Sequence, residues 1–129
     1  MACDADWVAF CVLIVDDNET FLGAARALLE REGLSVVGVA STAAEALPLA
    51  ATLRPDVVLV DIALADESGF EVCRRLADQN RAGGSAVILI STHAEADFAE
   101  LIAESPATGF LPKSELSANA IRRIVEGGG

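Results

Sequence analysis

Short apolar runs alternate with segments of helical spacing along this sequence, and this alternation limits the possible folds more than any other feature. Five runs are expected to be strands, and they cover Cys11–Val15, Ser35–Ala40, Val57–Val60, Ala86–Ile90 and Gly109–Leu111. Most of them lack the polar alternation of a half-exposed sheet, which is typical of parallel strands covered on both faces. The sequence therefore predicts a doubly wound α/β fold with a five-stranded parallel sheet.

The segments between the runs carry apolar residues at helical spacing. From Phe21 to Leu29 such residues recur at i, i+4, i+7 and i+8. Five helices are expected: one that ends at Gly33, Thr42–Leu53 with Ser41 or Thr42 as its cap, one that follows Gly69, Ala96–Glu104 and Ser117–Glu126. Pro48 lies inside the second span, where it is expected to kink the helix or delay its start, because it removes a backbone hydrogen bond.

The length of 129 residues suits a single domain over residues 1–129, with a core from about residue 9 to 126. Hydrophobic residues make up 53% of the chain and charged residues 22%, so the chain can bury a substantial core. Nine basic residues against 20 acidic ones leave a net charge of −11, which repels phosphate backbones and anionic lipid surfaces. We therefore expect neither direct nucleic-acid binding nor membrane association.

No apolar stretch approaches the roughly 20 residues of a membrane span, and the first six residues lack the basic start of a signal peptide. A cytoplasmic location is expected. The three cysteines, Cys3, Cys11 and Cys73, form no CxxC pair, so they indicate neither a zinc site nor a disulfide framework. Cys11 and Cys73 are interpreted as small core residues.

Polar side chains follow four of the five predicted strands. These are Asp16 and Asp17, Asp61, Ser91 and Thr92, and Lys113. Each alone has an ordinary explanation, as a helix cap, a solvated loop residue or a surface charge. The carboxyl ends of parallel strands meet at one edge of a sheet, where α/β proteins bind their ligands. Three carboxylates there repel one another strongly, so the pattern predicts a hard divalent cation, and Mg²⁺ suits carboxylate oxygens.

Four segments of the sequence closely resemble the signature blocks of bacterial response regulator receiver domains. These segments are Val12–Asn18, Pro55–Asp61, Val87–Thr92 and Gly109–Lys113. The resemblance extends from about Ala9 to Val125. It implies a (βα)5 sheet of flavodoxin-like order 2-1-3-4-5, within a two-component signalling protein.

The resemblance also assigns roles to single residues. Asp61 matches the phosphoacceptor, which takes a phosphoryl group from the phosphohistidine of a sensor histidine kinase or a histidine phosphotransfer protein. Asp17, Asp61 and the backbone carbonyl of Ala63 match direct Mg²⁺ ligands, and Asp16 matches a residue that acts through bound water. Lys113 matches the lysine that pairs with phosphoryl oxygens.

Two further residues match the switch of the family. Ser91 corresponds to the hydroxyl that turns toward the phosphoryl group, and Phe110 to the aromatic rotamer switch. The resemblance implies that phosphorylation alters the face formed by the fourth helix, fifth strand and fifth helix, to which a downstream protein or output domain binds. Without the family context, Phe110 could equally be a plain core residue.

The chain departs from the family pattern in places that affect loops and phosphoryl lifetime. Ser114 follows Lys113 where a proline is usual, and Ala65 stands where another proline is common. Ala63 and His93 occupy the two positions that tune lifetime in receiver domains. Ala63 cannot orient a water through its side chain, so slow hydrolysis is expected unless His93 positions that water. His93 could also be a simple exposed loop residue.

Two other functions compete with the phosphoacceptor. A phosphatase or phosphotransferase of the haloacid dehalogenase kind would need an acidic residue two positions after Asp61, where this chain has Ala63. A degenerate receiver could serve as an interaction scaffold without phosphorylation, but the complete acidic set argues against it. The expected activity is therefore not that of an enzyme on other substrates, since the domain would catalyse only its own phosphorylation and dephosphorylation.

Overall fold

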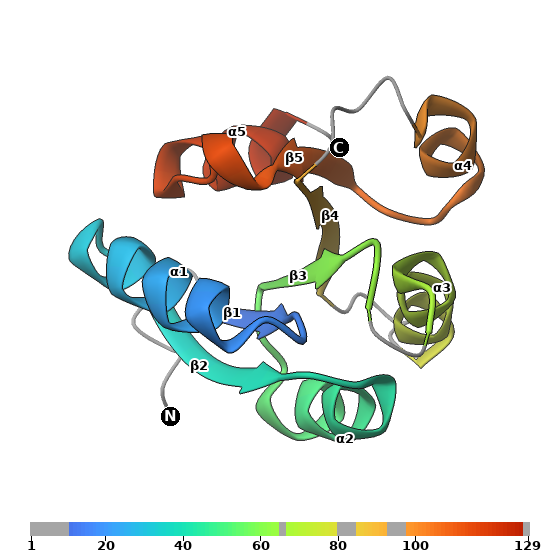
Figure 1. The fold of residues 1–129 in the computed structure, drawn as a ribbon, viewed down its shortest axis with the longest axis horizontal. Coiled ribbons are helices and arrows are strands. Elements are labelled where there is room, and N and C mark those ends of the chain that lie inside the picture. The colour runs from blue at the N-terminus through green and yellow to red at the C-terminus, as the bar shows by residue number, and fades with distance from the viewer. Residues whose placement is uncertain (1–10, 65–66, 80–84, 93–97, 128–129) are drawn as a thin grey trace.

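The computed structural model describes residues 11–64, 67–79, 85–92 and 98–127. Within these residues, five parallel strands form one sheet in the order β2-β1-β3-β4-β5. The strands are β1 (Cys11–Val15), β2 (Ser35–Ala40), β3 (Val57–Asp61), β4 (Ala86–Ser91) and β5 (Gly109–Pro112). The prediction of a doubly wound α/β fold with flavodoxin-like order is confirmed, and strands and helices alternate along the chain (Figure 1).

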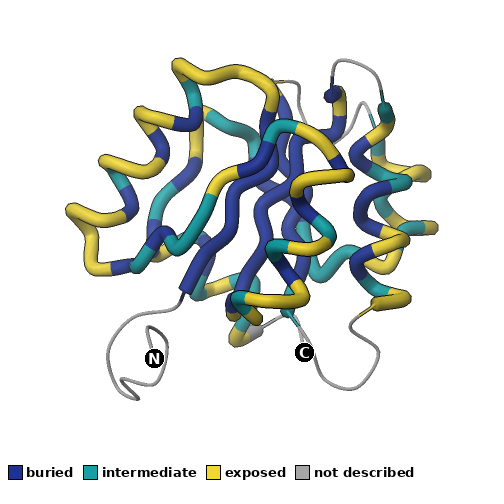
Figure 2. Tube along the Cα trace, turned by 90° about the horizontal axis from the view of Figure 1, so that it is seen from below, coloured by how far each residue is buried: buried dark blue, intermediate teal, exposed yellow. Residues whose placement is uncertain are grey.

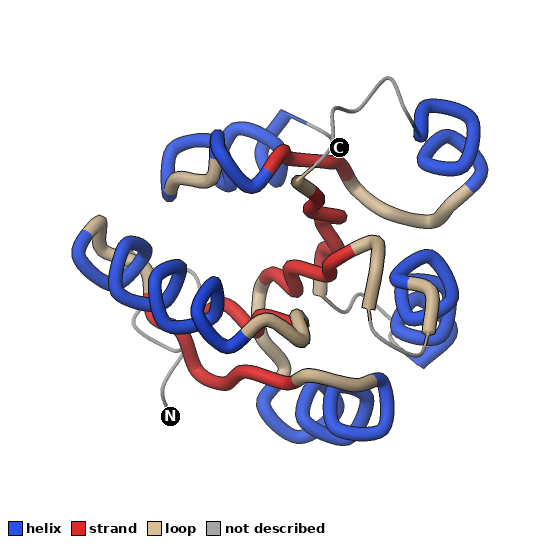
Figure 3. The backbone as a smooth tube through the Cα atoms, viewed as in Figure 1, coloured by secondary structure: helices blue, strands red, loops and turns tan. Residues whose placement is uncertain are grey.

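The helices of the described segments are α1 (Glu19–Arg31), α2 (Ala43–Leu53), α3 (Gly69–Gln79), α4 (Ala99–Glu104) and α5 (Ala118–Gly127). A single turn of 3-10 helix, η2 (Lys113–Glu115), joins β5 to α5 and was not predicted. The helices flank the sheet, with α1 and α5 on one side and α2, α3 and α4 on the other (Figures 1 and 3). The predicted start of α4 at Ala96 lies outside the described residues.

The core divides into two apolar layers, one on each face of the sheet. Alternate residues of a strand point to opposite faces, so Leu13 packs with α2 and α3, while Ile14 packs with α1 and α5. All residues of β1 and β3 are buried, which explains why these strands lack polar alternation. Figure 2 shows the buried strands at the centre and the exposed residues on the outer sides of the helices.

Burial supplies most of the stability of this arrangement, because each fully buried Val, Leu or Ile contributes about 1.5–3 kcal/mol.

Helix α2 tests the prediction about Pro48. Pro48 lies inside the helix, which begins at Ala43 with Thr42 as its cap, so a delayed start is not observed. The Thr42 hydroxyl accepts from the Glu45 N–H at 3.2 Å, and Arg54 ends the helix in the left-handed conformation, with φ 48°. The Arg54-Pro55 step therefore closes the helix as predicted, because a residue before proline disfavours continued helix.

Both described cysteines are buried. Cys73 is a free thiol in the core, and burial raises its pKa to about 11. Cys11 is 1% exposed, which agrees with a core position. The interpretation of both as small core residues is confirmed, but Cys11 is also disulfide-bonded, a bond that the cysteine spacing did not indicate. Cys3 lies outside the described residues. A short-range sequence pattern could not reveal this bond, because disulfide pairing depends on the fold.

In the part of the chain that the structure describes, no helix combines the length and the apolar composition needed to cross a bilayer.

Candidate functional site

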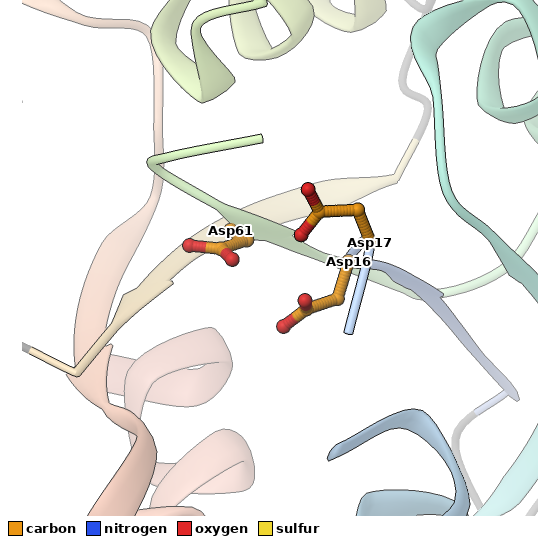
Figure 4. A group of neighbouring side chains, drawn as sticks. All are labelled: Asp16, Asp17 and Asp61. Atoms are coloured by element: carbon orange, nitrogen blue, oxygen red, sulfur yellow. The ribbon is translucent and has the colours of Figure 1, made fainter. Parts of the chain in front are cut away.

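Three aspartates meet at the carboxyl edge of the sheet. Asp16 and Asp17 directly follow β1, and Asp61 is the last residue of the neighbouring strand β3. One carboxylate oxygen from each lies within 4.8 Å of the other two, and Figure 4 shows the three side chains around a common point. The structure therefore brings together the three carboxylates that the strand pattern placed at this edge.

Asp16 is fully buried, with 0% of its surface exposed. Its Oδ1 accepts a hydrogen bond from the Asn18 N–H at 2.9 Å, which ties the carboxylate to the start of α1. Its Oδ2 forms an ion pair with Lys113 Nζ at 2.6 Å. No described atom donates a further hydrogen bond to this buried oxygen, so it keeps acceptor capacity beside the lysine.

Asp61 is 7% exposed and is held from two sides. Its Oδ1 accepts from the Ala63 N–H at 3.1 Å, and its Oδ2 lies 3.3 Å from Lys113 Nζ. Burial raises the pKa of Asp61 above its ordinary value, the Ala63 amide opposes that shift, and the negative charge of Asp16 adds to it. Lys113 lowers the pKa through its charge and its hydrogen bond, but the net shift is upward.

Lys113 is the only lysine in the chain and provides the positive charge of the site. It opens the 3-10 turn after β5, which directs it toward β1 and β3, and its side chain is only 12% exposed. Its Nζ also lies 4.3 Å from the centre of the Phe21 ring, on α1. One ammonium therefore contacts Asp16, Asp61 and an aromatic face.

The charges in this group do not balance. With all three aspartates ionised, Lys113 leaves a formal charge of −2 at one sheet edge. Two carboxylates at this separation repel by about 3 kcal/mol at an effective dielectric near 20. The donors are all carboxylate oxygens, and among the described residues the buried Asp16 Oδ2 has Lys113 as its polar partner. This donor set fits a hard divalent cation that binds oxygen.

The other predicted site residues lie on the same edge or behind it. Ser91 is the last residue of β4 and is 3% exposed, and the preceding residue, Ile90, pairs with Asp61. Phe110, in β5, is 7% exposed and belongs to the core layer that also contacts Phe98 and Ile102 from the α4 side. His93, which together with Ala63 was predicted to tune the lifetime of the acyl phosphate, lies outside the described residues.

The exposed residue Ala63 follows β3 and forms an isolated antiparallel bridge with Ser68. Nearby, Gly69 allows a close backbone approach, because a Cβ there would collide with the Asp61 carbonyl oxygen and lie 2.7 Å from the Ile62 Cα. Ala63 is thus paired with Ser68, and Gly69 packs closely against the backbone at the end of β3.

Sequence reasoning missed two residues that support the site. Phe21 was expected only on the apolar face of the first helix, but its ring also contacts Lys113. Glu67 had no predicted role, and its Oε2 accepts from the Ala43 N–H at 2.7 Å, which ties the loop after Asp61 to the start of α2. Both contacts join segments far apart in the sequence, so no local motif could have indicated them.

Comparisons with known proteins agree with this architecture. The family model described as the response regulator receiver domain matches residues 12–126. The response regulator GacA of Pseudomonas aeruginosa is 35% identical over 121 residues, which cover 90% of this chain and 55% of GacA. The chain spans about half the length of the curated relatives it matches.

Two solved structures have the same fold. The signal receiver domain of NarL from Mycobacterium tuberculosis superposes with a TM-score of 0.80 at 27% identity, covering 93% of this chain and 98% of that one. A response regulator from Burkholderia pseudomallei, described as containing a phosphorylated aspartic acid, calcium ion and citrate, has a TM-score of 0.75 at 26% identity. That match covers 90% of this chain and 66% of the other. This chain therefore belongs to the receiver domains of two-component response regulators.

Proposed function

We propose that this receiver domain accepts a phosphoryl group on Asp61 in a Mg²⁺-dependent reaction. The donor is the phosphohistidine of a sensor histidine kinase or a histidine phosphotransfer protein. One observation carries the proposal: the carboxylates of Asp16, Asp17 and Asp61 converge within 4.8 Å, and the only lysine pairs with two of them. The phosphorylated aspartic acid and calcium ion described for the Burkholderia pseudomallei relative support the same chemistry.

The transfer needs little from the protein beyond positioning and charge neutralisation. A carboxylate oxygen of Asp61 forms a bond to phosphorus while the P–N bond of the phosphohistidine breaks, and the imidazole nitrogen keeps the bonding electron pair. The product is an acyl phosphate on Asp61. Lys113, already 3.3 Å from Asp61 Oδ2, is close enough to pair with a phosphoryl oxygen after transfer.

Mg²⁺ would be held by Asp17, Asp61 and the backbone carbonyl of Ala63, with Asp16 acting through bound water. When bound, it would neutralise phosphoryl oxygens and relieve the repulsion among the aspartates. The all-oxygen donor set and the excess of three carboxylates over one ammonium support this assignment. The Ala63 N–H donates a hydrogen bond to Asp61 Oδ1, so the backbone two residues after Asp61 orients the phosphoacceptor carboxylate.

Phosphorylation would then be communicated through Ser91 and Phe110. The Ser91 hydroxyl would turn to the phosphoryl group, and Phe110 would move into the space beside it. Support comes from burial, since Ser91 is 3% and Phe110 7% exposed, and from the contact of the Phe110 layer with Phe98 and Ile102. The face formed by α4, β5 and α5 would change and bind a downstream protein or output domain.

The domain itself would bind no nucleic acid, because a charge of −11 repels phosphate backbones. One relative carries the name transcriptional regulatory protein DesR, from Bacillus subtilis, and this chain covers 58% of it. We propose that any nucleic-acid contact of a full-length regulator would be made outside residues 1–129.

The lifetime of the acyl phosphate is a further part of the proposal. Ala63 is exposed beside the acceptor and has no side-chain group to orient a water, so hydrolysis should be slow unless His93 assists. His93→Ala separates the two cases: an unchanged slow rate means that the water is unassisted, and a slower rate means that His93 positions it. A lifetime of seconds in both proteins would contradict this account.

The test is phosphorylation by acetyl phosphate with Mg²⁺, read by intact mass. The wild type should gain one phosphoryl group, and Asp61→Asn should gain none. Asp56→Asn is the matched control, since Asp56 stands at the other end of β3, where its side chain accepts a hydrogen bond from the Cys11 N–H. An adduct that persists in Asp61→Asn, or no adduct in the wild type, would overturn the proposal and favour a scaffold.

A further inference from the structure

Phe21 lies beside the ammonium group of Lys113, in the first turn of α1. The Lys113 Nζ is 4.3 Å from the centre of its ring, within the range of a cation–π contact. The same Nζ is 2.6 Å from Asp16 Oδ2 and 3.3 Å from Asp61 Oδ2. The ammonium therefore contacts two carboxylates and an aromatic face, which is consistent with a side chain only 12% exposed.

The contacts of Phe21 form a closed ring with the acidic group. Asp16 Oδ1 accepts from the Asn18 N–H at 2.9 Å, and Asn18 Oδ1 accepts from the Phe21 N–H at 3.1 Å. The Phe21 ring contacts Lys113 Nζ, which in turn pairs with the second oxygen of Asp16. Asn18, which caps α1, therefore also helps to position the Phe21 ring relative to Lys113.

We propose that Phe21 is a positioning residue, whose ring face holds the Lys113 ammonium directed at Asp61. An aromatic face attracts the ammonium through its quadrupole but adds no net negative charge. It therefore does not compete as a counterion when Lys113 pairs with phosphoryl oxygens. A carboxylate at this place would add to an already excessive negative charge, and an aliphatic side chain would fill the space without attracting the cation.

The simpler alternative is that Phe21 only packs against the core layer of α1 and α5. The two explanations differ in what they demand of the side chain. Packing needs apolar volume, which Phe21→Leu largely keeps. Positioning of Lys113 needs a ring face, which Phe21→Trp keeps and Phe21→Leu removes. Comparing these two variants therefore separates the explanations even if one of them lowers stability.

Lys113 can be observed alone, because the chain has no other lysine. Labelling with lysine enriched in ¹³C at Cε gives one side-chain signal in the spectrum of the full chain. In the wild type, the Phe21 ring current should displace that signal from the position of a free lysine. Phe21→Leu should return the signal toward the free position, and Phe21→Trp should keep it displaced. Phe70→Leu is the matched control, since Phe70 pairs with Phe98 on the α3 side of the sheet.

The second measurement is the rate of Asp61 phosphorylation by acetyl phosphate at saturating Mg²⁺. Loss of one cation–π contact should slow the reaction by about threefold to tenfold in Phe21→Leu. Phe21→Trp should retain the rate to within about twofold, as should Phe70→Leu.

This inference rests on the proposed function for the role of Lys113, but the two fail differently. If the wild type takes up no phosphoryl group, the proposed function fails. If the wild type is phosphorylated and Phe21→Leu changes neither the Lys113 signal nor the rate, the positioning role of Phe21 is wrong. Equal slowing in Phe21→Leu and Phe21→Trp, with the lysine signal still displaced in the tryptophan variant, also contradicts it, because the ring face alone would then not matter.

Discussion

Strand β3 has an aspartate at each end, and the two residues have different surroundings. Asp56 precedes the strand and is exposed, and its Oδ2 accepts a hydrogen bond from the Cys11 N–H at 2.8 Å. Asp61 ends the strand, is 7% exposed, and lies among two other carboxylates and one ammonium. The residue type is the same, so the difference comes from which end of the parallel sheet each side chain occupies.

The comparison shows how the fold separates a structural carboxylate from the one that we propose to be phosphorylated. At the amino end, Asp56 accepts one hydrogen bond from the neighbouring strand and keeps its remaining contact with water. At the carboxyl end, β1 and β3 bring three carboxylates to one place, where burial and Asp16 raise the pKa of Asp61. At the amino end, Asp56 thus links β3 to β1 through a hydrogen bond. At the carboxyl end, three carboxylates and one ammonium leave a net negative charge that a cation can neutralise.

The largest expected effect comes from removing the cation at the carboxyl end. Lys113→Met keeps the stem of the side chain and leaves Asp16 and Asp61 without their partner. Breaking a buried ion pair in this way costs about 3–5 kcal/mol, so the free energy of unfolding in EDTA should fall by that amount. Urea titrations with and without Mg²⁺ measure it.

Mg²⁺ should restore part of the loss in Lys113→Met, because it supplies positive charge to the same carboxylates. The wild type should also gain stability with Mg²⁺, by about 2.7 kcal/mol at one hundred times its dissociation constant. A loss below about 1 kcal/mol in EDTA would mean that the pair is effectively solvated and that the two ends of β3 differ less than the contacts indicate.

The next effect concerns Asp61 itself and its dependence on pH. The folded protein holds a proton on Asp61 more tightly than the unfolded chain does. In the unfolded chain the pKa of Asp61 is near 3.8. Without metal, this contribution to stability is therefore present below that value and is lost as the pH rises through the raised pKa. Asp61→Asn removes the charge, so at neutral pH without Mg²⁺ it should be more stable than the wild type by up to about 3 kcal/mol.

Chemical unfolding in EDTA from pH 4 to pH 8 checks the sign. The stability gained by Asp61→Asn should grow with pH over this range, and Mg²⁺ should stabilise the variant much less than the wild type. Asp56→Asn should show neither behaviour, since Asp56 is exposed and lies at the opposite end of the strand from the described carboxylate cluster. A variant that is less stable than the wild type at pH 7 without metal would show that Asp61 is satisfied by Ala63 and Lys113 alone.

A third effect, somewhat smaller, tests the backbone that carries Asp61. Gly69→Ala would place a Cβ against the Asp61 carbonyl and Ile62 Cα, so β3 or the start of α3 must shift, at a cost of about 1–3 kcal/mol. The shift should also weaken Mg²⁺ binding. The matched control is Gly23→Ala in α1, where a Cβ meets nothing within 4 Å and should add about 0.5–1 kcal/mol of helix stability. Thermal unfolding and Mg²⁺ titration of both variants measure the contrast, and equal effects would contradict it.

Much of this architecture could be predicted from local sequence. The strands β1 and β2 have the predicted bounds, and β3, β4 and β5 each extend one residue beyond the prediction. Those extra residues are Asp61, Ser91 and Pro112, polar or cyclic residues that an apolar pattern excludes, although their backbones still pair with neighbouring strands. The placement of Asp16, Asp17 and Asp61 at one edge followed from strand polarity alone, because parallel strands bring all their carboxyl ends together.

What could not be predicted depends on contacts between distant segments. The Phe21 ring and Lys113 are far apart in sequence and meet only because the fold brings the start of α1 next to the turn η2. Glu67 reaches the start of α2 for the same reason, and the disulfide bond of Cys11 likewise depends on the fold. Periodicity reports which face of an element is buried, whereas these contacts require the positions of two elements at once.

The smallest effect belongs to the amino end of β3. Asp56→Ala removes the acceptor for the Cys11 N–H and should cost about 1 kcal/mol, while Asp56→Asn, which keeps an acceptor oxygen, should cost less. The backbone of Asp56 still donates to the Cys11 carbonyl and accepts from Ala86, so β1, β3 and β4 stay joined. Neither variant should alter Mg²⁺ binding or phosphoryl uptake, and urea unfolding with intact mass measures both. If Asp56→Ala cost as much as Lys113→Met, or reduced phosphoryl uptake, sheet polarity would not be what distinguishes the two aspartates.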